Sequence, residues 1–135
     1  MSKIKILLVG YGYWGPNLAR NLNNNPKVEF SGILEVDKEL HEKIASDYPD
    51  VPIFDNLNDI GETHHAAIVS TPATTHFSVG STLLQKGLHV LIEKPLATSI
   101  EDSNKLIDIA SNNNLKLMVG HTYLYNSAVL KIKEI

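Results

Sequence analysis

Residues 4–18 read IKILLVGYGYWGPNL, an apolar run that leads into a glycine-rich turn and then into the start of a helix. Gly10, Gly12 and Gly15 form the pattern Gly-x-Gly-x-x-Gly. In a phosphate-binding turn the first glycine permits the bend out of the strand. The second lets the backbone approach a pyrophosphate, and the third lets the helix pack closely on the strand. The flanking strand and helix supply the context that this pattern requires, so we expect a dinucleotide to bind here.

An acidic residue, Glu35, lies 20 positions after the last glycine of the turn and ends a second apolar run, residues 28–34. A carboxylate there can accept both ribose hydroxyls of an adenosine and repels a 2′-phosphate. The only arginine, Arg20, lies inside the first predicted helix, and Lys38 is the only cation near Glu35. We therefore predict NAD rather than NADP. In the alternative interpretation, Glu35 is only a solvated residue at the end of a strand. Asp37 is then the alternative acid.

Apolar periodicity and turn residues predict six strands that alternate with helices. The predicted strands are residues 3–9, 28–35, 51–54, 66–70, 88–93 and 115–119, and the predicted helices are 15–23, 38–46, 76–86 and 99–112. Such alternation requires a parallel sheet, and its apolar runs are typical of strands buried on both faces. We predict an α/β fold, a doubly wound, Rossmann-type parallel sheet of about six strands with helices on both faces.

Residues 1–120 are predicted to form a dinucleotide-binding domain, and residues 121–135 the start of a connection and of a helix leading to a substrate domain absent from this chain. Ser99 is a predicted N-cap. Asparagine clusters at 23–25 and 112–114 fall at predicted helix ends, where asparagine tolerates the left-handed conformation.

The 135 residues are 43% hydrophobic, which suits one packed domain, and they include no cysteine. Disulfides, thiolate metal sites and cysteine nucleophiles are therefore excluded. With no signal-peptide cleavage site and no long apolar run, the chain is expected to be cytoplasmic and without a membrane partner. The net charge is −3 and the charges are dispersed, so we expect no nucleic-acid partner. We predict no metal site, because the adjacent His64 and His65 point apart and lack a third ligand.

In a doubly wound sheet the ligand lies beyond the carboxyl ends of the strands, so the residues that follow each strand are the candidates for binding it. Besides Glu35, these candidates are Ser70, Thr71, Pro72 and His76 after the fourth strand, Glu93 and Lys94 after the fifth, and His121 after the sixth. Each of the two histidines either bonds a ribose, a nicotinamide amide or a substrate hydroxyl, or caps a loop. Tyr13 and Trp14 are predicted to pack around the pyrophosphate turn.

Lys94 is the predicted catalytic residue, because the proline that follows it restricts its backbone and an ammonium can exchange a proton. Beside a cationic nicotinamide ring, and partly desolvated, the ammonium would lose its charge more readily. That suits the transfer of a hydroxyl proton during hydride transfer. The alternative is a surface lysine paired with Glu93.

Four motifs occur in an order that resembles the glucose–fructose oxidoreductase and inositol dehydrogenase family. They are GYGYWG at 10–15, STPATTH at 70–76, EKP at 93–95 and VGHTYLYN at 119–126. The resemblance covers essentially the whole chain but only the first domain of such enzymes. Their second α/β domain, with an open sheet, completes the substrate pocket and forms the oligomer interface.

The resemblance implies that Lys94 lies near the nicotinamide and the substrate, that Glu35 binds the ribose, and that Thr71, Pro72 and His76 line the cofactor cleft. It implies an NAD-dependent oxidoreductase that oxidises a secondary hydroxyl of a sugar or nucleotide-linked sugar by hydride transfer, as a homo-oligomer at full length. The motifs are most similar to those of UDP-N-acetylglucosamine and UDP-N-acetylglucosaminuronate 3-dehydrogenases. The family's second catalytic group, a histidine with an acidic neighbour, has no counterpart here, so this chain alone is expected to be inactive.

Two alternatives belong to other classes of protein. The first is a nucleotide-binding or redox-sensing module without catalysis. The second is a methyltransferase, whose cofactor also binds at a glycine turn, but this interpretation leaves Lys94 and the proline after it unexplained.

Overall fold

The computed structural model describes residues 2–135, and it contains one six-stranded parallel sheet. The strands are β1 (Ile4–Val9), β2 (Val28–Leu34), β3 (Ile53–Phe54), β4 (Ala66–Val69), β5 (His89–Glu93) and β6 (Leu117–Gly120). They pair in the order β3-β2-β1-β4-β5-β6, and every pair is parallel. The strand order reverses between β1 and β4. The predicted doubly wound, Rossmann-type fold is therefore confirmed.

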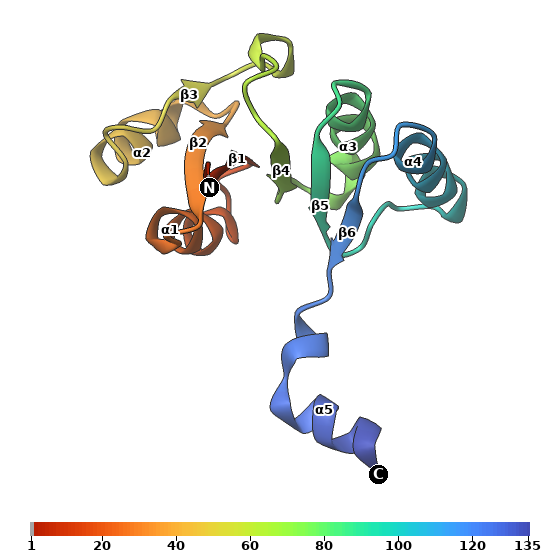
Figure 1. Cartoon of the computed structure of the whole chain (residues 1–135). Coiled ribbons are helices and arrows are strands. Elements are labelled where there is room, and N and C mark those ends of the chain that lie inside the picture. Colours follow the sequence, from red (N-terminus) through yellow and green to blue (C-terminus); the bar gives the residue numbers. More distant parts are fainter. Residues whose placement is uncertain (1) are drawn as a thin grey trace.

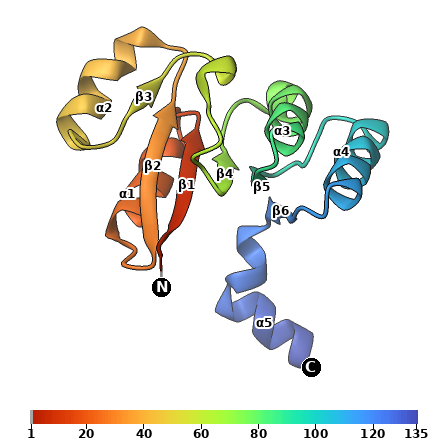
Figure 2. The ribbon, with the colours of Figure 1, turned by 45° about the horizontal axis from the view of Figure 1, so that its top comes forward.

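Two pairs of helices cover opposite faces of this sheet. Helices α1 (Gly15–Asn24) and α2 (His41–Asp47) lie beside β1 to β3, and α3 (His76–Gln85) and α4 (Ile100–Asn112) lie beside β4 to β6 (Figures 1 and 2). Leu8 of β1 is buried with side chains of α1 and α2, whereas its neighbours Leu7 and Val9 are buried with side chains of α3 and α4. Successive side chains of a strand point to opposite faces, so the side chains of β1 pack toward both helix pairs.

Burial on both faces is confirmed for β1 but is wrong for β4 and β5. Ile68 and Leu91 are only half-buried, and Met118 on β6 is 45% exposed. These three side chains line a shallow apolar hollow on the sheet. The connection from β3 to β4 contains only the short 3-10 turn η2 (Leu57–Asp59). The described residues therefore supply no crossover helix to cover this half of the face.

The predicted helix ends are only partly confirmed. The Ser99 hydroxyl accepts the backbone N–H of Asp102 at 3.0 Å, as expected of an N-cap. Asn114 has the predicted left-handed backbone, with φ of 54°. Asn25 does not, because Pro26 follows it and disfavours helical backbone at the preceding residue; its φ is −86° and its ψ 114°. The predicted helix 38–46 also splits, since the 3-10 turn η1 (Lys38–Leu40) precedes α2.

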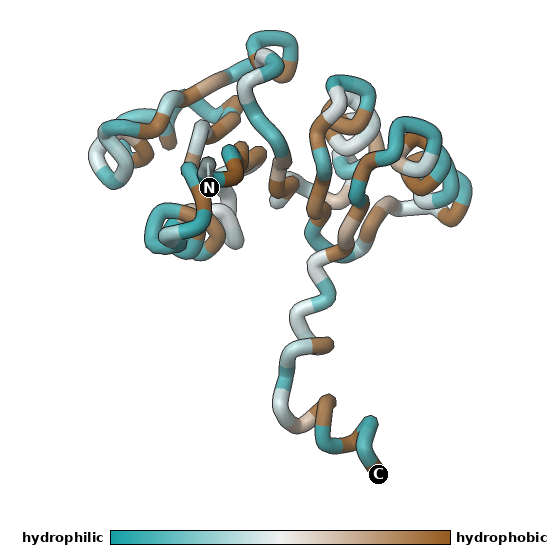
Figure 3. Tube along the Cα trace, viewed as in Figure 1, coloured by the Kyte–Doolittle hydropathy of each residue, from teal (hydrophilic) through white to brown (hydrophobic). Residues whose placement is uncertain are grey.

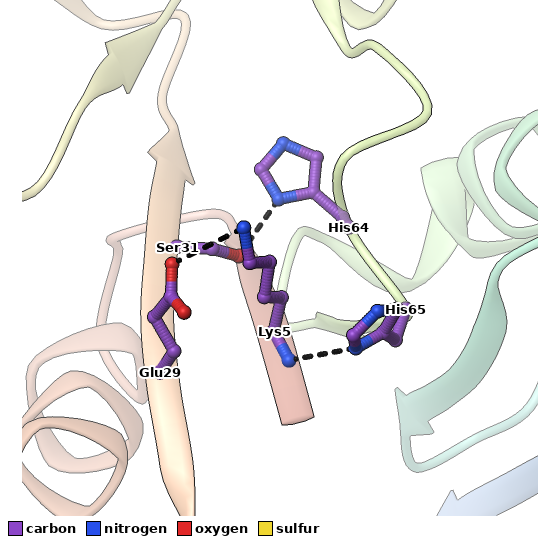
Figure 4. Close-up of polar contacts among 5 residues, drawn as sticks. All are labelled: Lys5, Glu29, Ser31, His64 and His65. Carbon is purple, nitrogen blue, oxygen red and sulfur yellow. Dashed lines mark hydrogen bonds and ion pairs between the residues drawn. The ribbon is translucent and has the colours of Figure 1, made fainter. Parts of the chain in front are cut away.

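Polar side chains meet at the amino-terminal end of the sheet, opposite the end where ligands bind in such folds (Figure 4). The ring of His64 is buried, and its Nδ1 lies 2.7 Å from the Ser31 hydroxyl. The backbone N–H of Lys5 donates to Nδ1 of His65 at 3.0 Å. The Lys5 ammonium pairs with Glu29 at 3.6 Å. These contacts join β1, β2 and the segment that leads into β4.

The last helix, α5 (Ser127–Glu134), follows the 3-10 turn η4 (Thr122–Tyr125) and extends away from the sheet (Figures 1 and 2). Hydrophobic residues recur along it, as the brown segments in Figure 3 show, and Leu130 and Ile132 are exposed. No helix within residues 2–135 has both the length and the apolar character that a membrane crossing needs. The predicted domain boundary at residue 120 coincides with the end of β6 and stays a prediction.

Candidate functional site

A pocket of about 310 Å³ lies at the carboxyl ends of β1, β4 and β5. We call it the glycine-turn pocket. The predicted site residues that line it are Gly12, Tyr13, Trp14, Ser70, Thr71, Pro72, His76, Glu93 and Lys94. Ala73 also lines it, and the sequence analysis did not select that residue. Three loops that are distant in sequence therefore meet where the strand-end rule predicts a ligand.

The three glycines of the turn serve different purposes. Gly10 has a φ of +94°, and a Cβ there would lie 2.9 Å from the carbonyl oxygen of Ser70. A Cβ on Gly15 would lie 2.7 Å from the carbonyl oxygen of Gly10. The turn itself therefore requires both of these glycines. A Cβ on Gly12 would meet no atom within 4 Å, so the space beside Gly12 is open.

Ser70 and Tyr11 hold the turn in place from either side. The Ser70 hydroxyl donates to the carbonyl oxygen of Gly10 at 2.8 Å, which fixes the end of β4 to the turn. The Tyr11 ring is buried against α1 and α2, and its hydroxyl lies 3.4 Å from a carboxylate oxygen of Asp47. Burial, together with Tyr48 and Asp47, raises the pKa of Tyr11 to about 12, so this hydroxyl stays protonated.

The aromatic residues of the turn do not pack as predicted. Tyr13 is 95% exposed and its ring lies 5.9 Å from that of Trp14, centroid to centroid. Trp14 precedes α1, and its side chain does not cap the helix. The first N–H groups of a helix carry a partial positive charge that attracts an anion. In α1, Pro16 has no N–H and the N–H of Asn17 donates to the carbonyl oxygen of Trp14, which leaves the N–H of Gly15 for an anion.

Glu93 is a buried carboxylate on the wall of the glycine-turn pocket. It is 8% exposed, and its Oε2 has no hydrogen-bond partner among the described residues. Gly120 lies opposite Glu93 in the pairing of β5 with β6, and a Cβ there would lie 3.0 Å from Oε1 of Glu93. The absence of a side chain at Gly120 therefore leaves room for this carboxylate. A buried acceptor without a partner is costly, so Oε2 of Glu93 is an unsatisfied acceptor within the wall of the pocket.

Lys94 is exposed, and within residues 2–135 no ion pair joins it to Glu93. The alternative of a surface lysine paired with Glu93 is thus not what the structure shows. The peptide bond between Lys94 and Pro95 is cis. Lys94 also lines a second pocket of about 300 Å³, formed with residues of η4 and α5, which we call the β6 pocket.

His121 lies in the β6 pocket and does not line the glycine-turn pocket. The structure thus places it apart from the other predicted cofactor-binding residues, with Lys94 as the residue that both pockets share. His121 directly follows β6, but η4 leads the chain away from the glycine turn.

His76 is the first residue of α3 and is 1% exposed. Its Nδ1 lies 2.7 Å from the carbonyl oxygen of Pro95, and its Nε2 lies 2.9 Å from that of Thr71. The sequence leaves two alternatives for His76, a contact with a ligand or a contact with a loop. Both ring nitrogens contact carbonyl groups of loops, which is the second alternative. His76 lines the pocket but both of its polar atoms face the backbone.

Glu35 is 7% exposed, and its carboxylate accepts two backbone N–H groups. Oε2 accepts from Tyr11 at 2.6 Å, and Oε1 accepts from Asp37 at 2.9 Å. The backbone carbonyl of Glu35 lies 2.7 Å from Nε2 of His41. Glu35 is therefore not a solvated strand end. Asp37 is exposed, and its carboxylate caps η1 by accepting the N–H of Glu39.

A further pocket of about 320 Å³ lies beyond the ends of β1, β2 and β3, and we call it the β2–β4 pocket. Thr71 and Pro72 line both this pocket and the glycine-turn pocket. The other lining residues, which were not predicted as site residues, are Val9, Leu34, Val36, Asp55, Asn56, Leu57, Thr75 and Val79. Four of them, Val36 and residues 55–57, directly follow β2 or β3, so the strand-end rule identifies them when it is applied to every strand.

An ion pair lies beside this pocket. The Lys38 ammonium lies 3.1 Å from the Asp55 carboxylate. Arg20 is on α1, where its guanidinium contacts Asn17. The part of the chain that the structure describes contains no cluster of three or more His, Cys, Asp or Glu side chains that could hold a metal ion.

Comparison with known proteins gives a consistent match. A family model described as "Oxidoreductase family, NAD-binding Rossmann fold" matches residues 4–121. An uncharacterized oxidoreductase of Streptococcus pneumoniae is 30% identical over 98% of this chain. A UDP-N-acetylglucosamine 3-dehydrogenase of Acidithiobacillus ferrooxidans is 35% identical over 52% of the chain. An NADP⁺-dependent scyllo-inositol 2-dehydrogenase of Bacillus subtilis is 26% identical over the entire chain.

A solved structure of similar fold is the NAD-binding protein from Listeria innocua, with a TM-score of 0.90 and 26% sequence identity over 98% of this chain. The chain spans 40% of that structure, 36% of the Streptococcus protein, 22% of the Acidithiobacillus protein and 38% of the Bacillus protein. The similarity is therefore to one domain of longer proteins.

Proposed function

The chain belongs to the oxidoreductase family with an NAD-binding Rossmann fold, and we propose that it holds NAD across the ends of β1 and β4 for hydride transfer with a sugar. One observation carries the proposal. The glycine-turn pocket and the β2–β4 pocket are adjacent, and Thr71 and Pro72 form part of the wall of each. A dinucleotide has two nucleotide halves joined by a pyrophosphate, which suits two pockets on either side of a shared wall. Dinucleotides bind where the strand order of such sheets reverses.

The pyrophosphate is assigned to the turn between β1 and α1. Gly10 and Gly15 are needed by the turn itself, but the open space beside Gly12 has no use within the protein. A ligand that contacts the backbone at Gly12 explains why a glycine is present there. At the uncapped start of α1 the N–H of Gly15 is available to the same anion, since Pro16 has no N–H and that of Asn17 is already bonded.

The nicotinamide half is assigned to the glycine-turn pocket, beside Glu93 and Lys94. The unpartnered Oε2 of Glu93 supports a hydroxyl donor at this wall, and the ribose of a nucleotide carries such hydroxyls. Bound NAD would supply the hydride acceptor. Lys94 lines both this pocket and the β6 pocket, which supports it as the residue whose neutral amine takes a proton from a substrate hydroxyl.

The adenosine half is assigned to the β2–β4 pocket, whose walls include the apolar side chains of Val36, Leu57 and Val79. Glu35 stands at the end of β2 next to this pocket, and each of its carboxylate oxygens keeps a lone pair beyond the one that accepts a backbone N–H. The negative charge of Glu35 disfavours a 2′-phosphate. Lys38 is already paired with Asp55, which supports NAD over NADP.

The substrate is proposed to be a sugar or a nucleotide-linked sugar with a secondary hydroxyl. The names of two relatives support this class, one acting on UDP-N-acetylglucosamine and the other on scyllo-inositol. Because the chain spans well under half of these relatives, the activity, the substrate and a homo-oligomeric assembly are proposed for the whole protein.

Calorimetric titration of the chain with NADH and with NADPH tests the proposal. We expect NADH to bind more tightly, and Gly12→Val to remove this binding without loss of the fold. Gly61→Val is the matched control, because a Cβ on Gly61 also meets no atom within 4 Å and this glycine lies in an exposed loop outside the site. The proposal is overturned if the folded chain releases no heat with NADH, or if both valine variants bind NADH equally well.

A further inference from the structure

His76 faces two acceptors at once, because Nδ1 lies 2.7 Å from the carbonyl oxygen of Pro95 and Nε2 lies 2.9 Å from that of Thr71. Carbonyl oxygens only accept hydrogen bonds, and a neutral imidazole donates from one nitrogen only. A neutral ring would therefore set a lone pair against one of the two oxygens, in a place from which water is excluded. Only a ring with a proton on each nitrogen donates to both.

The two carbonyl groups belong to different walls of the glycine-turn pocket. Thr71 is in the loop after β4, and it also lines the β2–β4 pocket. Pro95 directly follows Lys94 at the end of β5. The ring of His76 therefore joins the loop that both pockets share to the turn that carries Lys94.

The charged groups near the ring are few. Helix α3 carries no Asp, Glu, Lys or Arg, and residues 70–75 carry none. Helix α4 packs against α3 and carries Lys105, whose ammonium pairs with Glu101 and lies 5.9 Å from the centre of the Phe77 ring, next to His76 in the chain. Glu93 and Lys94, at the end of β5, are the charged residues that line the glycine-turn pocket with His76. Of these, the Glu93 carboxylate is buried, and it is the acidic side chain among the residues that line this pocket.

We propose that His76, protonated on both ring nitrogens, is a positioning residue that locks the loop after β4 to the turn after β5. The lock sets the spacing between Thr71 and Lys94, and so the width of the glycine-turn pocket. It exists without a ligand, and only its effect on cofactor binding rests on the proposed function. His76 acts through these two loops and offers no polar atom to the cofactor.

The first test needs no cofactor. In the chain labelled with ¹⁵N-histidine, NMR spectra report which ring nitrogens carry protons, and the His76→Gln variant identifies the signals of His76. We expect protons on both nitrogens, each in slow exchange with water. A single-proton tautomer would overturn the lock, whether or not the chain binds NADH.

The second test measures NADH affinity of His76→Gln, with His89→Gln as the control. His89 is exposed at the opposite end of the sheet, where its Nδ1 accepts the N–H of Lys116. A lost hydrogen bond from a charged donor predicts roughly tenfold weaker NADH binding by His76→Gln and little change in the control. Equal affinity of the two folded variants would overturn the proposal.

The pH profile separates the lock from a purely structural role. Glu93 and Lys94 are present in both proteins, so the difference between the NADH-affinity profiles of wild type and His76→Gln reports His76. We expect the two profiles to differ, because a proton on each ring nitrogen is available only in the wild type. Parallel profiles would contradict a protonated lock. If wild type does not bind NADH at all, the proposed function fails, and the NMR measurement still decides the state of His76.

Discussion

The carboxylate of Glu35 accepts the backbone N–H of Tyr11 at 2.6 Å. Its other oxygen accepts the N–H of Asp37, so one buried side chain joins the glycine turn after β1 to the loop after β2. The residue assigned to the ribose therefore also shapes the turn assigned to the pyrophosphate. A substitution at this position acts on folding stability and on cofactor choice together.

Glu35→Ala leaves the buried N–H of Tyr11 without an acceptor, which is expected to lower the free energy of unfolding by about 1–3 kcal/mol. The same change removes the charge that repels a 2′-phosphate, so NADH affinity should fall by more than NADPH affinity. Urea denaturation measures the first effect and calorimetry the second. Glu29→Ala is the control, since Glu29 makes only a surface ion pair with Lys5. An equal loss of both affinities would remove Glu35 from ribose recognition.

Gly10→Ala should destabilise the chain by more than Gly87→Ala does. Both glycines have positive φ, +94° and +84°, so both substitutions carry the cost of a left-handed backbone, about 1 kcal/mol or more. Only at Gly10 does the new Cβ also meet an atom, the carbonyl oxygen of Ser70 at 2.9 Å. Urea denaturation of the two variants isolates the cost of this contact. Equal losses would show that the turn moves freely away from β4.

The sequence predicts best those parts of the fold that depend on local patterns of residues. The apolar run before Gly10 and the helix start after Gly15 define β1 and α1, and the alternation of strands and helices gives the parallel order. The strand-end rule then brings together Thr71 and Lys94, although 22 intervening residues separate them in the chain. These inferences succeed because strand direction alone fixes which loops share an edge of the sheet.

What the sequence does not predict depends on contacts between distant residues. Nothing near His76 reveals that its ring lies against the carbonyl oxygen of Pro95, or that Oε2 of Glu93 has no partner. The position of His121 depends on the direction that η4 takes after β6, which the strand-end rule does not include. The half-buried face at Ile68 and Leu91 reflects a crossover without a full helix.

Lys94→Ala should leave NADH affinity nearly unchanged, since Lys94 forms no hydrogen bond or ion pair with the residues that the structure describes. Turnover should fall by about 10²- to 10⁴-fold, the range for a lost acid–base group. NADH affinity is measured on this chain. Turnover is measured on the protein at the full length of its relatives. Lys86→Ala is the control, because Lys86 contacts the carbonyl oxygen of Ile60 outside the site. Unchanged turnover would remove Lys94 from the mechanism.

The stability of the chain should decline in mild acid because of His64. Burial lowers the pKa of His64 from its usual 6.5, and the positive charge of Lys5 and the neighbouring His65 lower it further (Figure 4). In the unfolded chain the ring titrates near 6.5, so below that pH the unfolded state binds more protons and gains free energy relative to the folded state. The stabilisation is complete above 6.5 and is lost as pH falls toward the folded pKa. Thermal unfolding from pH 7.5 to 5 should show this decline in wild type and a shallower one in His64→Gln, which keeps a polar partner for Ser31. If both proteins lose stability in parallel, other groups cause the decline.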